Sequence, residues 1–319
     1  MTRILTRSEV AGLVTMADAV EAVEEAFGAM VRGESQMPSK VYLSMADLDG
    51  DFRAMPARRG EFASLKWVNA HPHNPERYGL PAVLASLILN DARKASTLAV
   101  MDATRITALR TGAAAAVATK HCLAGEVPAS LGIVGAGVQG KLLIEAHRVI
   151  YPNITVVVAD LDTARATALA SEFGGRTGTL EAACACTVVC TATPARRPVV
   201  QLEHLGPDCR HINAMGADAP NKQEIAGAVL KSAWLIVDSR EQATHSGEVN
   251  VPLHDGLLTA ADIAGDIGQV VAGHLKRPPT ARLSLFDSTG LAIQDLALAE
   301  RALARAEANN IGLLVDLHA

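Results

Sequence analysis

The sequence predicts an α/β protein, with a doubly wound parallel sheet in the second half of the chain and an α+β domain before it. The first observation is that short β-rich runs alternate with helical stretches from about residue 130. Parallel strands need a long crossover connection, so this alternation indicates βαβ units. The second observation is that the first 115 residues follow a different pattern, in which one helical segment precedes several strand-like runs.

In the second half, six runs are predicted to be strands because they are rich in β-branched and apolar residues. They are LGIVGAG (131–137), ITVVVAD (154–160), CTVVCTAT (186–193), HINAMG (211–216), WLIVDS (234–239) and LSLFDS (283–288). The stretches between them are predicted to contain the crossover helices.

The first half begins with apolar residues at the three- and four-residue steps of a helix: Val20, Val23, Phe27 and Met30. Strand-like pieces follow at 40–45, 64–72 and 81–91. The last segment, residues 291–310, has the pattern of an amphipathic helix that could pack on either domain. Because no Ser/Gly linker is present, we expect the halves to be joined through helices such as 107–123.

Composition limits the class of protein. The chain has 319 residues, 49% of them hydrophobic, with a net charge of -5, which argues against nucleic acid as a partner. No run of about 18 apolar residues occurs, so we expect a cytoplasmic protein that does not bind membranes. The five cysteines form no disulfide framework and no convincing metal-ligand set, and we expect them to be reduced and buried.

The most informative motif is the glycine-rich turn at 135–140, GAGVQG, which follows a predicted strand and opens a helical run. Gly135 would allow the tight turn, Gly137 would let a pyrophosphate approach the backbone, and Gly140 would let helix and strand pack closely. With Val138 and Gln139 between them, these residues are predicted to bind a dinucleotide at the N-terminus of the helix.

Asp160 indicates which dinucleotide is bound. It ends the strand after the glycine-rich turn, where an acid can accept hydrogen bonds from the adenosine ribose. A 2′-phosphate would be repelled there, and the next residues supply no cation. The sequence therefore predicts NAD and not NADP.

Three cations stand among apolar residues in the first half: Arg53, Lys66 and Arg110. Such groups are seldom buried without a partner, so together they could hold a carboxylate. The alternative for any one of them is a surface charge or an internal ion pair. Alternation along a strand would point Lys66 and Val68 to one face, and Leu65 and Trp67 to the other.

Asp218 follows the predicted strand 211–216. Ligands in open α/β sheets bind at the carboxyl ends of the strands, so Asp218 stands where chemistry would occur. The alternative is that it caps a helix in 221–230.

With these residues identified, the chain resembles the ornithine cyclodeaminase/μ-crystallin family, and within it the alanine-dehydrogenase-like and imino-acid-reductase members. The segments that carry the resemblance are Arg53 with MPA, Lys66 with WVNAHP, TALRTGAA (107–114), GAGVQG (135–140), INAMGADAPNKQEI (212–225) and LFDSTGLAIQD (285–295). They occur in the family's order. One departure is Pro81-Ala82, where cyclodeaminases tend to carry a threonine, and it argues against ornithine as the substrate.

The resemblance implies a substrate-binding and dimerisation domain, 1–117 with 291–319, and an NAD-binding Rossmann domain, 118–290. It implies that Arg53 and Lys66 bind the substrate and that Asp218 is the acid/base residue. The residues implied to contact the cofactor are Arg110, which could also lie near the substrate, Thr111, Met215, Gly216 and Ser288 with Thr289.

These inferences predict an NAD-dependent oxidoreductase that interconverts a small 2-imino or 2-oxo acid and its L-amino acid. Hydride would pass between the nicotinamide and the substrate α-carbon, and Lys66 or Asp218 would transfer the proton. The candidate substrates are pyruvate with ammonia, iminosuccinate and a cyclic ketimine. Two alternatives stay open: an ornithine-type cyclodeaminase that uses NAD catalytically, and a ligand-binding protein without activity.

Overall fold

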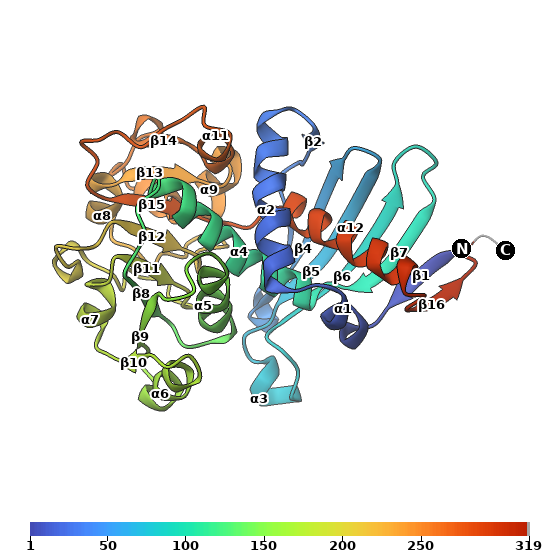
Figure 1. The fold of residues 1–319 in the computed structure, drawn as a ribbon, viewed down its shortest axis with the longest axis horizontal. Coiled ribbons are helices and arrows are strands. Elements are labelled where there is room, and N and C mark those ends of the chain that lie inside the picture. The colour runs from blue at the N-terminus through green and yellow to red at the C-terminus, as the bar shows by residue number, and fades with distance from the viewer. Residues whose placement is uncertain (318–319) are drawn as a thin grey trace. The chain divides into compact units, whose positions relative to one another are not determined.

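The computed structural model describes residues 1–317 and divides the chain into two compact units. The first unit contains Met1–Arg110 and the segment from Leu291 onward, and the second unit is Thr111–Gly290. The boundary between Arg110 and Thr111 falls inside the continuous helix α4 (Thr104–Cys122). The sequence suggested a boundary slightly later, after residue 117. Each unit contains its own sheet (Figure 1).

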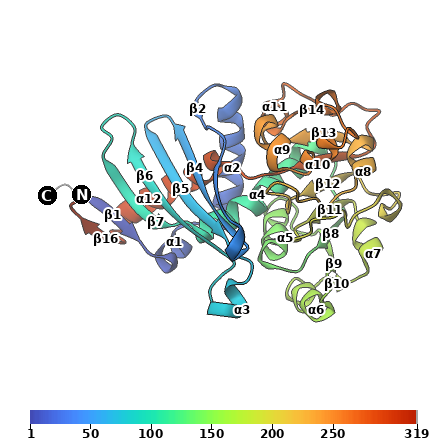
Figure 2. The same ribbon diagram turned by 180° about the vertical axis from the view of Figure 1, so that it is seen from behind.

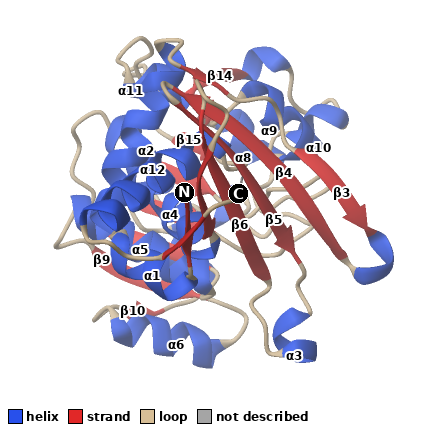
Figure 3. Ribbon diagram, turned by 90° about the vertical axis from the view of Figure 1, so that its right-hand side faces the viewer, coloured by secondary structure: helices blue, strands red, loops and turns tan. Residues whose placement is uncertain are grey.

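The first unit is built on a mixed sheet. Its strands are β1 (Thr2–Leu5), β2 (Ser35–Gln36), β3 (Val41–Met45), β4 (Gly50–Arg59), β5 (Phe62–Ala70), β6 (Val83–Asp91), β7 (Thr97–Asp102) and β16 (Leu313–Val315). The order is β16-β1-β7-β6-β5-β4-β2, and β3 also pairs with β4. The pairings β3–β4, β4–β5, β5–β6 and β6–β7 are antiparallel, and Figure 3 shows β4, β5 and β6 side by side.

Two long helices cover the inner face of this sheet. They are α2 (Met16–Val31) and α12 (Ala292–Ala308), and the shorter helices of the unit are α1 (Arg7–Leu13) and α3 (Asn74–Tyr78). Figure 1 shows α12 crossing the strands beside α2. The inner face is apolar, with Met55, Leu87 and Met101 almost completely buried, so helices and strands share one core.

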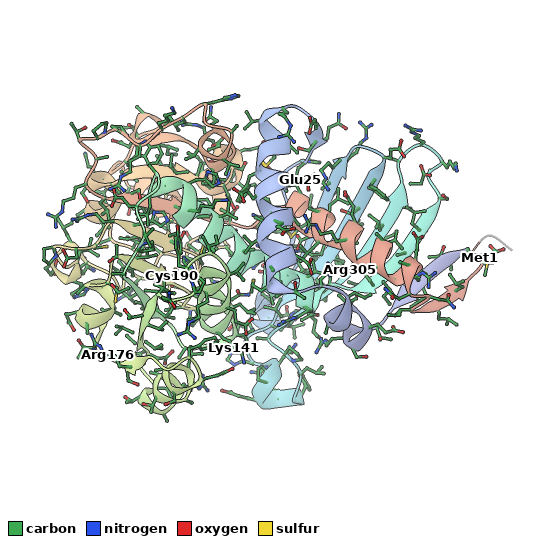
Figure 4. All side chains as sticks on the ribbon, in the orientation of Figure 1. Met1, Glu25, Lys141, Arg176, Cys190 and Arg305 are labelled. Atoms are coloured by element: carbon green, nitrogen blue, oxygen red, sulfur yellow. The ribbon has the colours of Figure 1, made fainter. Side chains whose placement is uncertain are left out.

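Charged pairs fix the two helices on the sheet. Arg305 of α12 donates to both carboxylate oxygens of Asp18 on α2, at 2.5 and 2.6 Å. Glu25 of α2 pairs with Arg59 of β4 at 3.1 Å, and Glu300 of α12 pairs with the same arginine. Figure 4 labels Glu25 and Arg305 on their helices. Because these pairs link α2, α12 and β4, they fix the helix that carries the site described below.

The second unit contains a sheet of eight strands in which every pairing is parallel, as the sequence predicts. The strands are β8 (Ser130–Val134), β9 (Thr155–Ala159), β10 (Arg176–Thr177), β11 (Val188–Thr191), β12 (His211–Ala214), β13 (Trp234–Val237), β14 (Ile263–Asp266) and β15 (Ser284–Asp287). Their order is β10-β9-β8-β11-β12-β15-β13-β14. The direction of winding therefore reverses beside β8, the strand that precedes the glycine-rich turn.

Helices connect these strands. They are α5 (Val138–Ile150), α6 (Thr163–Glu172), α7 (Leu180–Cys184), α8 (Gly227–Ser232), α9 (Arg240–Ser246), α10 (Asn250–His254) and α11 (Ile267–Val271). Figure 2 shows them around the sheet of this unit. The six predicted strands are present, whereas β10 and β14 were not predicted.

A buried hydrogen-bond network crosses the core of the second unit. His147 of α5 donates from Nδ1 to the Leu143 carbonyl at 2.7 Å, so its Nε2 accepts from the Thr119 hydroxyl at 2.8 Å. Asn213 donates to Thr119 and accepts from Nε2 of His211. Burial lowers the pKa of His147 to about 4 and that of His211 to about 3, so both rings are neutral.

Candidate functional site

Lys66 lies on the inner face of the first sheet. It occupies the middle of β5, where its relative exposure is 0% and that of Val68 is 7%, whereas Leu65 and Trp67 on the other face are 38% and 41% exposed. The predicted assignment of faces is confirmed. A primary amine therefore stands in the apolar core between the sheet and α12.

Asp295 of α12 is the partner of this amine. The Lys66 Nζ to Asp295 Oδ2 distance is 2.6 Å, and both side chains are buried. The Nε of Arg110 on α4 lies 3.4 Å from the other oxygen of the same carboxylate. The internal ion pair that the sequence left as an alternative is therefore present, within a group of three charges.

Several polar atoms of this group lack hydrogen bonds. In the part of the chain that the structure describes, Arg110 Nε, Asp295 Oδ1 and Gln294 Nε2 are buried and have no hydrogen-bond partner. The Arg110 Nη1 to Gln294 Oε1 distance is 3.5 Å, at the limit of a hydrogen bond. Arg110 Nε and Asp295 Oδ1 face each other as an ion pair without the geometry of a hydrogen bond. Because buried polar groups are normally satisfied, the hydrogen-bonding capacity that this group does not use can be taken up by a polar ligand or ordered water.

The environment of Lys66 changes its protonation. Burial, opposed by the Asp295 charge and assisted by the charges of Arg110 and Lys40, lowers the pKa of Lys66 to about 7. An amine with such a pKa can bind or release a proton near neutral pH.

Arg53 stands on the same face as Lys66. Its strand β4 pairs with β5 so that Met55 lies opposite Lys66 and Arg53 lies opposite Val68. Its guanidinium binds the Asp51 carboxylate through two contacts, at 2.8 and 3.0 Å, and lies 5.4 Å from the centre of the Tyr42 ring. The structure thus brings Arg53 to the same surface as Lys66, but Asp51 already neutralises it.

In the second unit, the glycine-rich turn has the geometry of a phosphate cradle. Gly135 has a φ of 109°, and a Cβ there would lie 2.6 Å from the Ala192 carbonyl oxygen. A Cβ at Gly140 would lie 2.2 Å from the Gly135 carbonyl oxygen. A Cβ at Gly137, in contrast, would meet open space, and no side chain caps α5 there. The first N–H groups of α5 are therefore available to an anion in that space.

Val138, Gln139 and Asp160 surround this turn. Val138 is 72% exposed and Gln139 is partly buried. Asp160 accepts hydrogen bonds from the backbone N–H of Ala136 at 2.6 Å and of Asp162 at 2.8 Å, and both of its oxygens keep lone pairs for further donors. The side chain after it, Leu161, is fully exposed.

Asp218 lies in the loop that follows β12 and not at a helix N-terminus. The next helix, α8, begins at Gly227 with Ala226 as its N-cap, so the capping alternative was wrong. The Asp218 side chain is 34% exposed and pairs with Lys222 Nζ at 2.8 Å. The same ammonium donates to the Gly216 carbonyl at 3.3 Å.

Most of the remaining predicted cofactor contacts directly follow buried strands, whereas Thr111 lies inside a helix. Met215 directly follows β12, and Thr111 is the first residue of the second unit, on α4; both are buried. Ser288 and Thr289 follow β15 and are held by the buried Asp238 carboxylate, which accepts from the Thr289 backbone N–H at 2.7 Å.

The cysteines are free and buried, as predicted. Burial raises the pKa of four of them to about 12: Cys122, Cys184, Cys190 and Cys209. Within residues 1–317, no group of three or more His, Cys, Asp or Glu side chains could hold a metal ion. Within the same range, no helix is long and apolar enough to cross a membrane.

Sequence reasoning missed Asp295, Gln294 and the carboxylates that hold the loops of the second unit. A signal existed for Asp295, because it lies on the buried face of an amphipathic helix, four residues after the buried Leu291. A charged residue at a core position of a helix is seldom buried without an oppositely charged partner, and the same holds for a lysine in a buried strand.

Comparison with known proteins identifies the family. The chain matches the model of the ornithine cyclodeaminase/mu-crystallin family over residues 1–310, and it belongs to that family. It is 44% identical to the alanine dehydrogenase of Archaeoglobus fulgidus over 318 residues, covering 98% of this chain and 97% of the relative. It is 32% identical to the L-lysine cyclodeaminase of Streptomyces rapamycinicus over 303 residues, covering 88% and 84%.

Solved structures show the same fold. An archaeal alanine dehydrogenase dimer with bound NAD superposes with a TM-score of 0.94 at 42% identity, covering 99% of both chains. The Δ1-pyrroline-2-carboxylate reductase of Thermococcus litoralis, in complex with NADH and L-proline, gives 0.92 at 31% identity, covering 98% and 100%. The iminosuccinate reductase of Paracoccus denitrificans, in complex with NAD+, gives 0.90 at 27% identity, covering 99% of both.

Proposed function

We propose that this chain is an NAD(H)-dependent oxidoreductase that interconverts a small 2-imino or 2-oxo acid and its L-amino acid. The observation that carries the proposal is the buried group of Lys66, Asp295 and Arg110, with its unsatisfied polar atoms. The relatives support it, because the similar proteins include an alanine dehydrogenase and imino-acid reductases whose structures hold NAD or NADH.

The substrate carboxylate binds to the cations of the first unit. Lys66 and Arg110 face it, and Arg53 joins them from the neighbouring strand when the carboxylate competes with Asp51 for its guanidinium. Each charge-assisted hydrogen bond contributes about 1.5–3 kcal/mol, so two suffice to orient the α-carbon.

NAD binds to the second unit. Gly137 and the first N–H groups of α5 would hold its pyrophosphate, and Asp160 would accept from its adenosine ribose. Arg110 and Thr111 would bind its phosphates, and Met215, Gly216 and Ser288 would lie near its nicotinamide half. Bound NAD accepts or supplies the hydride.

Lys66 and Asp218 handle the proton that accompanies the hydride. The Lys66 pKa of about 7 makes this amine half-protonated near neutral pH, so it donates in the reductive direction and accepts in the oxidative direction. Asp218 is partly exposed and pairs with Lys222, and we propose that it acts as the second acid/base group, exchanging a proton with the substrate amine or ammonia.

A second candidate is a cyclodeaminase, because the chain is 32% identical to an L-lysine cyclodeaminase. In that reaction the hydride is taken and returned, so no net NADH forms or is consumed. The distal ammonium of a diamino acid would need a carboxylate partner, and Asp51, which pairs with Arg53, is a candidate.

The protein is proposed to be a homodimer that uses the outer face of the first sheet. This face exposes large apolar side chains on β3, β5 and β6, namely Val41, Leu43, Leu65, Trp67 and Ile88. Trp67 stacks on Phe52 at 5.2 Å, which adds a flat aromatic surface. Exposed apolar patches of this kind mark protein interfaces, and the similar archaeal alanine dehydrogenase is a dimer.

The test is a screen for NADH oxidation with small 2-oxo acids, including pyruvate and oxaloacetate, in the presence of ammonium or methylamine. The proposal expects consumption of NADH that depends on both the oxo acid and the amine. L-Ornithine and L-lysine are tested in parallel with NAD. Release of ammonia and a cyclic amino acid without a change in NADH would favour the cyclodeaminase. Ligand binding without either reaction would indicate a binding protein.

A further inference from the structure

The loop that carries Asp218 is closed by a carboxylate outside the substrate and cofactor contacts considered so far. Glu224 is completely buried and ends this loop eight residues after Gly216. Its oxygens accept four hydrogen bonds, two from Thr193 and one each from Thr191 and Gly216, at 2.6–2.7 Å. Two of the four donors are backbone N–H groups, of Thr193 and Gly216, which cannot turn away from it.

These donors belong to two neighbouring strand ends. Thr191 is the last residue of β11 and pairs with Ala214, the last residue of β12. The ladder continues only to the Met215 N–H, which donates to the Thr191 carbonyl at 3.0 Å. Beyond that bond, Glu224 links the two segments that follow β11 and β12.

Glu224 is itself fixed from behind. Its backbone N–H donates to the Glu248 carboxylate at 2.7 Å, and its carbonyl accepts from the N–H groups of Val199 and Val200 at 2.7 and 3.0 Å. The backbone of this residue is therefore anchored on both sides, so its carboxylate is a fixed point for the loop.

Hydrogen bonds hold both peptide groups that flank the Cα of Gly216. Glu224 accepts from its N–H, and Lys222, which also binds Asp218, donates to its carbonyl. A Cβ at Gly216 would lie 2.5 Å from the Glu224 carboxylate and from the Thr193 carbonyl oxygen. Residue 216 is therefore glycine because the carboxylate comes so close, and not because of its φ.

We propose that Glu224 is a positioning residue for the reaction: it closes the loop 216–224 and so orients Asp218 without touching the substrate. The inference rests on the acid/base role proposed for Asp218. A misplacement of a reacting group by about 1 Å can cost about 100-fold in rate, so fixing this loop has a measurable consequence.

The test is a double-mutant cycle with Glu224→Gln and Asp218→Asn. Glutamine has the same shape but turns an N–H2 group toward Thr193 or Gly216, so the loop must shift. We expect Glu224→Gln to lower kcat about 10- to 100-fold. Because Glu224 also holds Gly216, which is proposed to stand near the nicotinamide, the Kd of NADH is measured for each variant and kcat is determined at saturating NADH; the turn between β8 and α5, which would hold the pyrophosphate, is untouched. Glu203→Gln, an exposed acid of the same unit, is the matched control and should leave kcat unchanged.

The cycle separates positioning from a general loss of structure. If Glu224 acts through Asp218, adding Glu224→Gln to Asp218→Asn should lower kcat no further. Equal fold losses in both backgrounds, or full activity of Glu224→Gln, would overturn the inference. If Asp218→Asn alone keeps full activity, the role proposed for Asp218 fails, and this inference fails with it.

A gentler variant keeps the inference testable if Glu224→Gln does not fold. Thr191→Val is isosteric and removes one hydroxyl donor to Glu224 while leaving both backbone donors in place. We expect about a three- to tenfold loss of kcat that again disappears in the Asp218→Asn background. A loss that persists there would overturn the positioning role.

Discussion

Asp295→Asn tests whether the buried carboxylate controls the charge of Lys66. The two groups are 2.6 Å apart and buried, so the substitution leaves the ammonium without its anion. Removing one partner of a buried pair costs about 3–5 kcal/mol, and about 1.4 kcal/mol corresponds to one pKa unit. The pKa of Lys66, about 7 with Asp295 present, should therefore fall by about 2–3 units.

The expected result is a loss of reductive activity that lower pH restores. A Lys66 that must donate a proton is largely neutral above about pH 5 in the variant, because its pKa has moved down. Near pH 7.5 the protonated fraction falls about 100-fold, and kcat/KM for reduction of the imine should fall by a similar factor.

Initial rates of NADH oxidation between about pH 5 and pH 9 measure this shift. Asp51→Asn is the matched control, because Asp51 pairs with Arg53 on the same face and has no pair with Lys66 among the ion pairs described above. The control should alter substrate KM and leave the pH dependence in place. The reasoning is refuted if the pH profile of Asp295→Asn matches that of the wild type or moves to higher pH.

Three further predictions concern the cofactor, acid stability and assembly. Replacing Asp160 by Ser and Leu161 by Arg should raise the preference for NADPH over NADH by about 10- to 100-fold, measured as the ratio of kcat/KM values, and an unchanged ratio would contradict the placing of the ribose. The folded state favours the neutral forms of His147 and His211, so below about pH 6.5 the unfolded chain binds protons more readily than the folded chain does. When the pH falls from 7 to 5, each histidine should therefore lower the free energy of unfolding by about 2 kcal/mol. In urea titrations, His147→Leu should lose about 2 kcal/mol less than the wild type over that range, and an equal loss would count against the network. Trp67→Glu should convert the dimer to a monomer in light scattering, and a variant that remains dimeric would place the interface elsewhere.

The second unit could be predicted well because its signals are local. Strands buried on both faces are continuous apolar runs, and the glycine-rich turn depends on contacts within a few residues of itself. The strands that were missed are short or atypical: β10 has two residues, and β14 contains Gly265. Neither pattern is distinguishable from a loop in a single sequence.

The site could be predicted only in part, because its pairs are distant in sequence. Lys66 was identified as a charge in a buried strand, but its partner Asp295 lies 229 positions away and becomes a neighbour only when α12 crosses the sheet. Glu224 was missed for a different reason. The segment 221–230 was considered as a helix, whereas its first part is an irregular loop that returns to Gly216.

The central claim, that hydride passes between NAD and the α-carbon of a small 2-imino or 2-oxo acid, is tested most directly with NADH in which both hydrogens at C4 are replaced by deuterium. The protein is incubated with this cofactor, ammonium and each active 2-oxo acid, and the product is analysed by mass spectrometry. The account predicts an L-amino acid with one deuterium on its α-carbon and one NAD formed per product. An unlabelled amino acid, or a product formed without consumption of NADH, would contradict it.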